Sequence, residues 1–233
     1  MDNMIDLNDL NDLKYPNDFD NIERSSVLLV TLPEFDVIRI AALQEELTAQ
    51  WHIECAIIDG EPPYDCIVHN HRMNFHLWHE EDIARRDDLG AERVRDAKRT
   101  IDRYNQERND AIERMDAWIH ERLPIISESS GVPLHSETPG MMVDRLSILA
   151  LKCYHMEEQA FREGATPVHR EVCMQKRDVL SRQRADLQRC LELLMLQLNA
   201  GERSFRIYKQ YKMYNDPDLN PQLYLEANCS HPA

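Results

Sequence analysis

The sequence predicts an all-α protein, an antiparallel bundle of about five helices. Three observations support this fold class. Apolar residues recur at helical spacing in several segments that are separated by proline and glycine. The chain has only 6 glycines, too few for the many turns of an all-β sandwich or barrel. It also has no glycine-rich loop of the Rossmann or P-loop type. With 233 residues, the chain is long enough for one well-packed domain, which we expect over residues 24–225.

The two ends of the chain are predicted to lie outside the bundle. Residues 1–23 repeat Asp-Leu-Asn and carry seven acidic residues against one basic residue, Lys14. Such acidic, low-complexity segments rarely fold alone, so we expect a disordered arm, with binding of a partner as the functional alternative. Residues 226–233 are expected to form a flexible tail.

The first two helices are predicted from apolar spacing and from the breaks around them. One begins near Pro33 and continues to Trp51, where the break 60–63 follows. The second is expected over 64–86 and ends at the turn 87–90.

The remaining three helices carry clearer start and stop signals. A long helix is expected over 91–123, ended by Pro124. Thr138-Pro139 and Thr166-Pro167 each combine an N-cap residue with proline in the first helical position, and they predict helices to about Phe161 and to Asn199. The last helix carries leucines at heptad-like spacing.

Basic and aromatic residues alternate in threes near the C-terminus, at Arg203, Phe205, Arg206, Tyr208, Lys209, Tyr211, Lys212 and Tyr214. On a helix this period gives one basic and one aromatic stripe. Two interpretations stay open: the aromatic rings dock on the bundle while the basic side chains reach solvent, or the segment is a lid that binds an anion or stacks on a nucleotide.

Charge argues against several classes of function. The formal net charge is -15, so phosphates repel the chain, and we expect no nucleic-acid partner and no attraction to anionic membranes. The longest apolar run, 27–30, is far too short to cross a membrane. The start of the chain does not have the pattern of a signal peptide. A cytoplasmic location is therefore expected.

Polar residues follow one face of each of the three middle helices. The second carries His71, Asn74, Trp78, Asp82 and Arg85 at spacings of 3, 4, 4 and 3, and the third carries Asp102, Asn105, Asn109, Glu113 and Asp116 at the same spacings. The fourth carries Asp144, Arg145, Lys152, His155 and Glu158, of which Asp144, His155 and Glu158 share one face with Leu151, and Lys152 lies next to that face. We expect these faces to meet in a pocket. Salt-bridged, solvated helix surfaces are the alternative.

These residue types suit the binding of a phosphorylated small molecule through a metal ion. Carboxylates one helical turn apart favour Mg²⁺ or Mn²⁺, and the candidate ligands are Glu81, Asp82, Glu113 and Asp116. His71 and His155 are the acid–base candidates. The predicted substrate-binding residues are Asn74, Trp78, Arg85, Asn105, Asn109, Asp144, Arg145 and Lys152, of which the basic ones would hold phosphate. A transition-metal site in the run His69, His71, His76 and His79 is a further option.

Several motifs resemble one family. They are HRMNFHLWHEEDIAR at 71–85, IDRYNQERND at 101–110, SETPG at 136–140, DRLSILALK at 144–152 and YKMYNDP at 211–217. Over about 34–225 the chain resembles the bacterial family catalogued as domain of unknown function 4254. The resemblance implies an all-helical protein without an established activity, in a family associated with envelope-glycan or glycosyltransferase genes, and it favours a pocket because its motifs fall on the polar faces.

A looser likeness connects the chain with all-helical nucleotide pyrophosphohydrolases. Glu113-Arg114-Met115-Asp116 is similar to their second metal-binding element, but their first element has a third glutamate where this chain has Ala84.

Three hypotheses follow. The first is a divalent-metal-dependent enzyme or binder acting on a nucleotide or nucleotide-sugar. The second is a non-catalytic interaction module, a homodimer partnered with a glycan-synthesis enzyme. The third is a histidine-ligated iron oxygenase.

Overall fold

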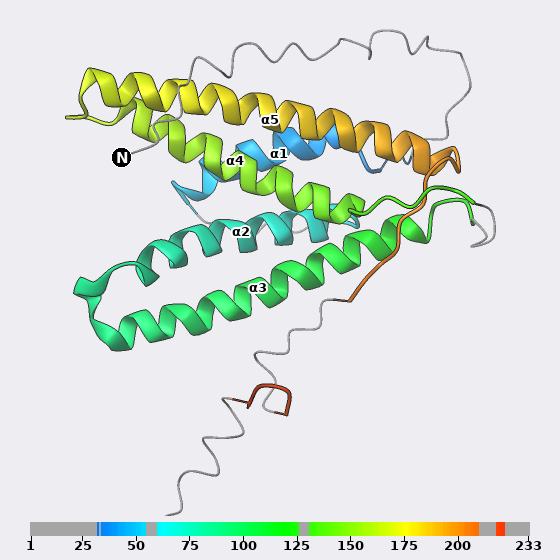
Figure 1. Cartoon of the computed structure of the whole chain (residues 1–233), viewed down its shortest axis with the longest axis horizontal. Helices are drawn as coiled ribbons and strands as arrows, with labels where there is room; N and C mark the ends of the chain where they lie inside the picture. Colours follow the sequence, from blue (N-terminus) through cyan, green and yellow to red (C-terminus); the bar gives the residue numbers. More distant parts are fainter. Residues whose placement is uncertain (1–31, 33, 55–59, 126–130, 210–217, 222–233) are drawn as a thin grey trace, which may run out of the picture.

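The part of the chain that the structure describes folds into five α-helices, labelled α1 to α5 in Figure 1. The computed structural model describes residues 32, 34–54, 60–125, 131–209 and 218–221. The helices are α1 (Val37–Trp51), α2 (Tyr64–Ala84), α3 (Gly90–His120), α4 (Pro139–Phe161) and α5 (Pro167–Asn199), and a short 3-10 turn η2 (Asp87–Leu89) precedes α3. The predicted all-α class is confirmed. The predicted acidic arm and C-terminal tail lie outside the described residues.

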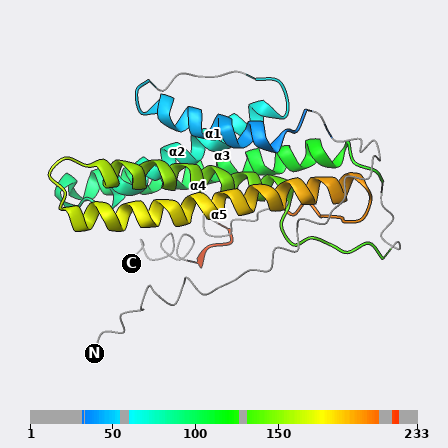
Figure 2. The same ribbon diagram turned by 90° about the horizontal axis from the view of Figure 1, so that it is seen from above.

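The helices form two antiparallel pairs with α1 laid against them. The α2–α3 pair is joined through η2, and α4 and α5 form the second pair. Figure 2 shows α1 on one face of this arrangement, where it contacts α4, α5 and α2. Within the described part of the chain, no helix has both the length and the apolar character needed to cross a membrane.

Helix starts follow the predicted capping signals. The Thr138 hydroxyl accepts a hydrogen bond from Met141 N, and the Thr166 hydroxyl accepts one from His169 N, both at 3.2 Å. Proline occupies the first helical turn in both helices. Helix α1 begins at Val37 rather than near residue 33, because Asp36 supplies its N-cap. These side chains satisfy amide groups that have no partner within the helix.

The apolar core lies where α1, α2, α3, α4 and α5 come together. Its fully buried members include Ile40, Ile67, Met115, Leu146 and Leu191. The predicted leucine stripe of α5 takes part, with Leu187, Leu191, Leu194 and Leu198 buried. Each such side chain stabilises the fold by roughly 1.5–3 kcal/mol relative to exposure.

The segment after α5 is not helical over residues 202–209, so the predicted helical stripes are wrong there. The chain instead pairs with the loop before α4: His135 N donates to Ser204 O at 2.7 Å, and Ser204 N donates to Pro133 O at 3.1 Å. Phe205 is buried against His120, whereas Tyr208 is exposed. Of the predicted aromatic stripe, Phe205 therefore docks on the bundle and Tyr208 does not. Residues 210–214 lie outside the described part.

The start of α4 is attached to α3 through Gly140. Gly140 N donates a hydrogen bond of 2.7 Å to Asp116 Oδ1. A Cβ atom at position 140 would lie 2.8 Å from that oxygen and 2.9 Å from Ile112 O. Because the second contact is with backbone, the two helices can approach this closely only with glycine at position 140.

Gly140→Ala is expected to lower the free energy of unfolding by about 1–3 kcal/mol, the usual cost of overpacking. Chemical denaturation measures this directly. Gly60→Ala is the control for a milder contact, since its Cβ would lie 3.3 Å from Asp65 N, and a smaller loss of stability is expected there. Equal effects of the two substitutions would contradict the steric argument.

Candidate functional site

A chain of buried hydrogen bonds connects α1, α2 and α4 through His71. Thr48 Oγ1 donates to Gln44 O at 2.7 Å and lies 3.0 Å from His71 Nε2. Ser147 Oγ lies 2.7 Å from His71 Nδ1. Since the Thr48 proton is already committed, Nε2 carries the ring proton and Nδ1 accepts from Ser147. All three side chains are fully buried, so each is held by its neighbours.

The chain of hydrogen bonds continues to a second buried group, the carboxylate of Asp144. Asn74 Nδ2 lies 2.9 Å from Ser147 Oγ and 2.9 Å from Asp144 Oδ1. Asn70 Nδ2 donates to the same carboxylate oxygen at 2.9 Å, and Arg108 Nε lies 3.2 Å from it. The charge of Asp144 is thus balanced by one cation from α3 and two amides from α2, which a buried carboxylate requires.

A cleft of about 410 Å³ lies above this network, between α2, α3 and α4. Its apolar walls are Leu77, Ile148 and Leu151. The cleft brings together six of the residues predicted from sequence: Asn74, Trp78, Glu81, Asp82, Arg85 and Asn105. Arg108 completes the lining and was not singled out from the sequence. The 3-4-4-3 stripe of α2 therefore leads from the buried network to the mouth of one cleft.

The mouth of the cleft is charged and exposed. Arg85 lies 3.2 Å from Glu81 and 4.0 Å from Asp82, measured between nitrogen and carboxylate oxygen. All three side chains are at least 45% exposed. Such ion pairs on one helix surface contribute little to stability, so these groups are able to exchange partners.

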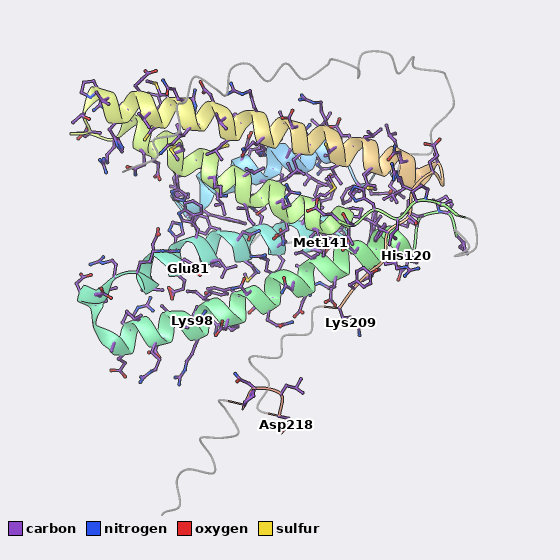
Figure 3. All side chains as sticks on the ribbon, viewed as in Figure 1. Glu81, Lys98, His120, Met141, Lys209 and Asp218 are labelled. Atoms are coloured by element: carbon purple, nitrogen blue, oxygen red, sulfur yellow. The ribbon has the colours of Figure 1, made fainter. Side chains whose placement is uncertain are left out.

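The four predicted metal carboxylates do not converge, so that part of the prediction is wrong. Glu80 pairs with Arg93, which places this end of α2 beside the start of α3. Glu113 lies about 30 Å further along α3 at about 1.5 Å per residue. Asp116 is at the far end as well, bound to the start of α4. Figure 3 shows Glu81 and Met141, the neighbour of Gly140, toward different ends of the bundle.

Four predicted substrate residues do not line the cleft, and one of them, Asp144, lies buried in the hydrogen-bond network described above. Arg145 and Lys152 line a different groove, between α4 and α5, and Arg145 pairs there with Glu137 at 2.7 Å. They point there because they follow Asp144 and Leu151 by one residue, which turns them about 100° around α4. Asn109 is buried on α3 and does not line the cleft.

His71 is unsuited to acid–base catalysis, contrary to the prediction. Burial lowers its pKa from 6.5 to about 3, so the ring is neutral at physiological pH. Both ring nitrogens are engaged, and the side chain has no exposed surface. It acts as a bridge between helices.

His155 lies at the edge of the cleft, in a cluster with His52 and His79. Its ring stacks on Trp78 with centroids 4.6 Å apart and planes at 6°. Its Nδ1 lies 2.7 Å from Glu158 Oε2. Burial lowers the pKa of both His79 and His155 below its usual value, and neighbouring imidazoles of the cluster lower it further, whereas Glu158 partly opposes the shift of His155. These rings are therefore neutral around pH 7.

His52 was not found by sequence reasoning. It is the C-cap residue of α1, outside every predicted stripe, and its ring stacks on Tyr154 at 4.2 Å. The one feature of the sequence that could have drawn attention to His52 is its position directly after Trp51, the last residue of the predicted helix. Residue spacing within one helix gives no indication that three helices meet at this point.

Asp116 carries a buried carboxylate whose pKa is raised from 3.8 to about 6 by burial, against the hydrogen bonds from Thr138 and Gly140. The folded state therefore holds this proton more tightly than the unfolded state, and stability is lost as pH rises from about 4 to about 6. Asp116→Asn is expected to raise the free energy of unfolding by up to about 3 kcal/mol at pH 7.5. Denaturation series at pH 4.5 and 7.5 measure the effect. A change of equal size at both pH values would contradict it.

His71 titrates with the opposite sign. Its folded pKa of about 3 lies below 6.5, so stability is lost as pH falls from about 6.5, by up to about 1.4 kcal/mol per pH unit. His71→Gln lacks this titration. At pH 7 it is expected to be about 2–4 kcal/mol less stable than wild type because partners in the buried chain are lost. That difference should narrow as pH falls toward 4, as measured by urea denaturation. A constant difference would count against the argument.

One family model matches residues 64–207, and its description is Protein of unknown function (DUF4254). No curated protein and no solved structure matches the chain. The matched region includes the cleft, His79 and His155, whereas α1 and His52 precede it.

Proposed function

Since the chain belongs to the DUF4254 family, whose description states no activity, we propose a function from the site: the cleft binds a phosphorylated small molecule with a planar ring, a nucleotide or nucleotide-sugar, together with Mg²⁺ or Mn²⁺. The observation that carries this proposal is the composition of the cleft. An indole, an arginine and two carboxylates line one opening between α2, α3 and α4.

The size and apolar lining suit one small molecule. A volume of about 410 Å³ is within the range of small-molecule sites. Trp78 offers a flat aromatic surface, and Leu77, Ile148 and Leu151 keep the inner part of the cleft apolar. A base stacked on an indole gains roughly 1–3 kcal/mol.

The inner polar groups supply orientation. Asn105 Oδ1 accepts from Arg108 at 3.3 Å, and Arg108 in turn faces the buried Asp144. This connection holds the α3 wall in one position. Polar groups that are fixed before binding lose little entropy when a ligand's hydroxyl or ring nitrogen meets them.

The charged mouth supplies phosphate and metal recognition. Mg²⁺ is commonly held by one or two carboxylates together with substrate phosphates, and Glu81 and Asp82 provide that pair. Arg85, now paired with these carboxylates, is released when a cation takes its place and can then donate to phosphate oxygens. The metal and the phosphate are thus expected to bind together.

A second function, the interaction module, has one supporting observation. Val168, Val172 and Val179 lie on one face of α5 and are 74%, 37% and 42% exposed. Apolar side chains repeated along a helix face suit contact with another helix, including that of a second copy. Sedimentation equilibrium of wild type and of Val168→Lys with Val172→Lys tests this alternative, which requires a dimer in the wild type alone.

The binding proposal is tested with ATP, UDP and UDP-glucose as probes, by calorimetry with and without Mg²⁺. At least one probe is expected to bind in a Mg²⁺-dependent manner. Arg85→Ala, and separately Glu81→Gln with Asp82→Asn, should each weaken that binding about 10-fold or more, equivalent to about 1.4 kcal/mol.

The matched controls are Arg95→Ala and Glu92→Gln. These residues form an exposed ion pair on α3, outside the cleft lining. They should bind like wild type. Absence of binding for all three probes, or equal losses in cleft and control variants, would overturn the proposal.

A further inference from the structure

Three histidines from separate parts of the chain converge beside the cleft. His52 follows α1, His79 lies on α2 and His155 lies on α4. One ring nitrogen from each lies within 4.8 Å of the others. Among the described residues, no other group of three histidines, cysteines or carboxylates meets this distance.

Two of the rings are oriented by hydrogen bonds at Nδ1. His52 Nδ1 lies 2.6 Å from Thr48 O, and His155 Nδ1 lies 2.7 Å from Glu158 Oε2. A carbonyl and a carboxylate can only accept, so each Nδ1 carries the proton. The lone pair of the neutral ring is then on Nε2. Metal-binding histidines are usually oriented in this way, by a carbonyl or carboxylate on the other nitrogen.

The opposite nitrogens have no such partner. His52 Nε2, His79 Nε2 and His155 Nε2 are all buried and make no hydrogen bond. A buried polar atom left unsatisfied costs about 1–3 kcal/mol. Three such atoms lie in one place, and coordination of one cation would engage all three nitrogens.

We propose that His52, His79 and His155 bind one divalent transition-metal ion, Zn²⁺ or an ion of similar ligand preference. Imidazole nitrogen suits Zn²⁺, Fe²⁺, Ni²⁺ and Cu²⁺, whereas Mg²⁺ requires oxygen. Tetrahedral Zn²⁺ with bonds of about 2.1 Å places its nitrogens about 3.4 Å apart. The three ring nitrogens, now within 4.8 Å of one another, would have to move closer on binding.

The surroundings hold the rings in place for such an ion. Trp78 stacks on His155, and Tyr154 stacks on His52, so two of the three imidazole planes are fixed by aromatic neighbours.

This ion is distinct from the Mg²⁺ proposed for the cleft, and the inference does not depend on that proposal. The two sites share Trp78, which lines the cleft and stacks on His155. Three protein ligands leave a coordination position for water or for a group of a bound molecule, as in catalytic rather than structural zinc sites.

The test uses the untagged full chain, because a histidine tag binds the same ions. Elemental analysis after purification, and calorimetric titration of the chelator-treated protein with Zn²⁺, should give one ion per chain. His79→Ala and His155→Ala should each weaken Zn²⁺ binding by more than about 100-fold. Glu158→Gln, which keeps an acceptor but loses its charge, should weaken it by roughly 10-fold.

The control is His69→Ala, a partly buried histidine on the same helix outside the cluster. It should bind Zn²⁺ like wild type. Thermal melts without metal show whether each variant is folded. If His155→Ala is not folded, the more conservative His155→Asn takes its place. Absence of saturable Zn²⁺ binding, or equal binding by wild type and the cluster variants, would overturn this inference. Retained Mg²⁺-dependent nucleotide binding in His155→Ala would show that the cleft acts without it.

Discussion

The position of α1 and α4 relative to α2 depends on the buried hydrogen-bond chain through His71. Its members come from three helices, and each donor among them has one acceptor in this arrangement. Burial of these groups would destabilise any packing in which the helices slid or rotated by one residue, because donors would then be left unpaired. The apolar core supplies most of the favourable free energy of folding, and the polar chain selects one register among similar apolar packings.

The two candidate sites both follow from that register. The buried hydrogen-bond chain ends at Asn74 and Asp144, beneath the cleft. The next two turns of α2 carry Trp78 and Asp82 to the mouth of the cleft. Thr48 belongs to the same hydrogen-bond chain, and its backbone carbonyl accepts a hydrogen bond from His52 and so orients that ring. Fixing His71 between Thr48 and Ser147 thus fixes the histidine cluster and the cleft together, although His71 touches no ligand in either.

The local part of this architecture was predictable, since caps and periodicity act within a few residues. The threonine–proline starts gave the first residues of α4 and α5, and the 3-4-4-3 spacing on α2 gave one side of the cleft. The long-range part was not. Spacing along α3 says nothing about which end of α2 it faces, so Glu113 and Asp116 were grouped with Glu81 and Asp82. His52 was missed because a residue just beyond a helix has no periodic pattern to reveal its direction.

The side chain of Trp78 connects the two candidate sites. One surface of the indole lines the cleft, and the ring stacks closely on His155. An ion bound at the cluster fixes His155 and therefore restricts the indole against which a planar ligand would stack. A ligand that orders the indole lowers, in turn, the entropy cost of fixing His155. By thermodynamic reciprocity, each of these proposed ligands would then strengthen the binding of the other by the same factor. The sharing of one aromatic side chain would therefore couple the proposed metal site to the proposed ligand site, both of which lie beside the face of α2 that the buried hydrogen-bond chain orients.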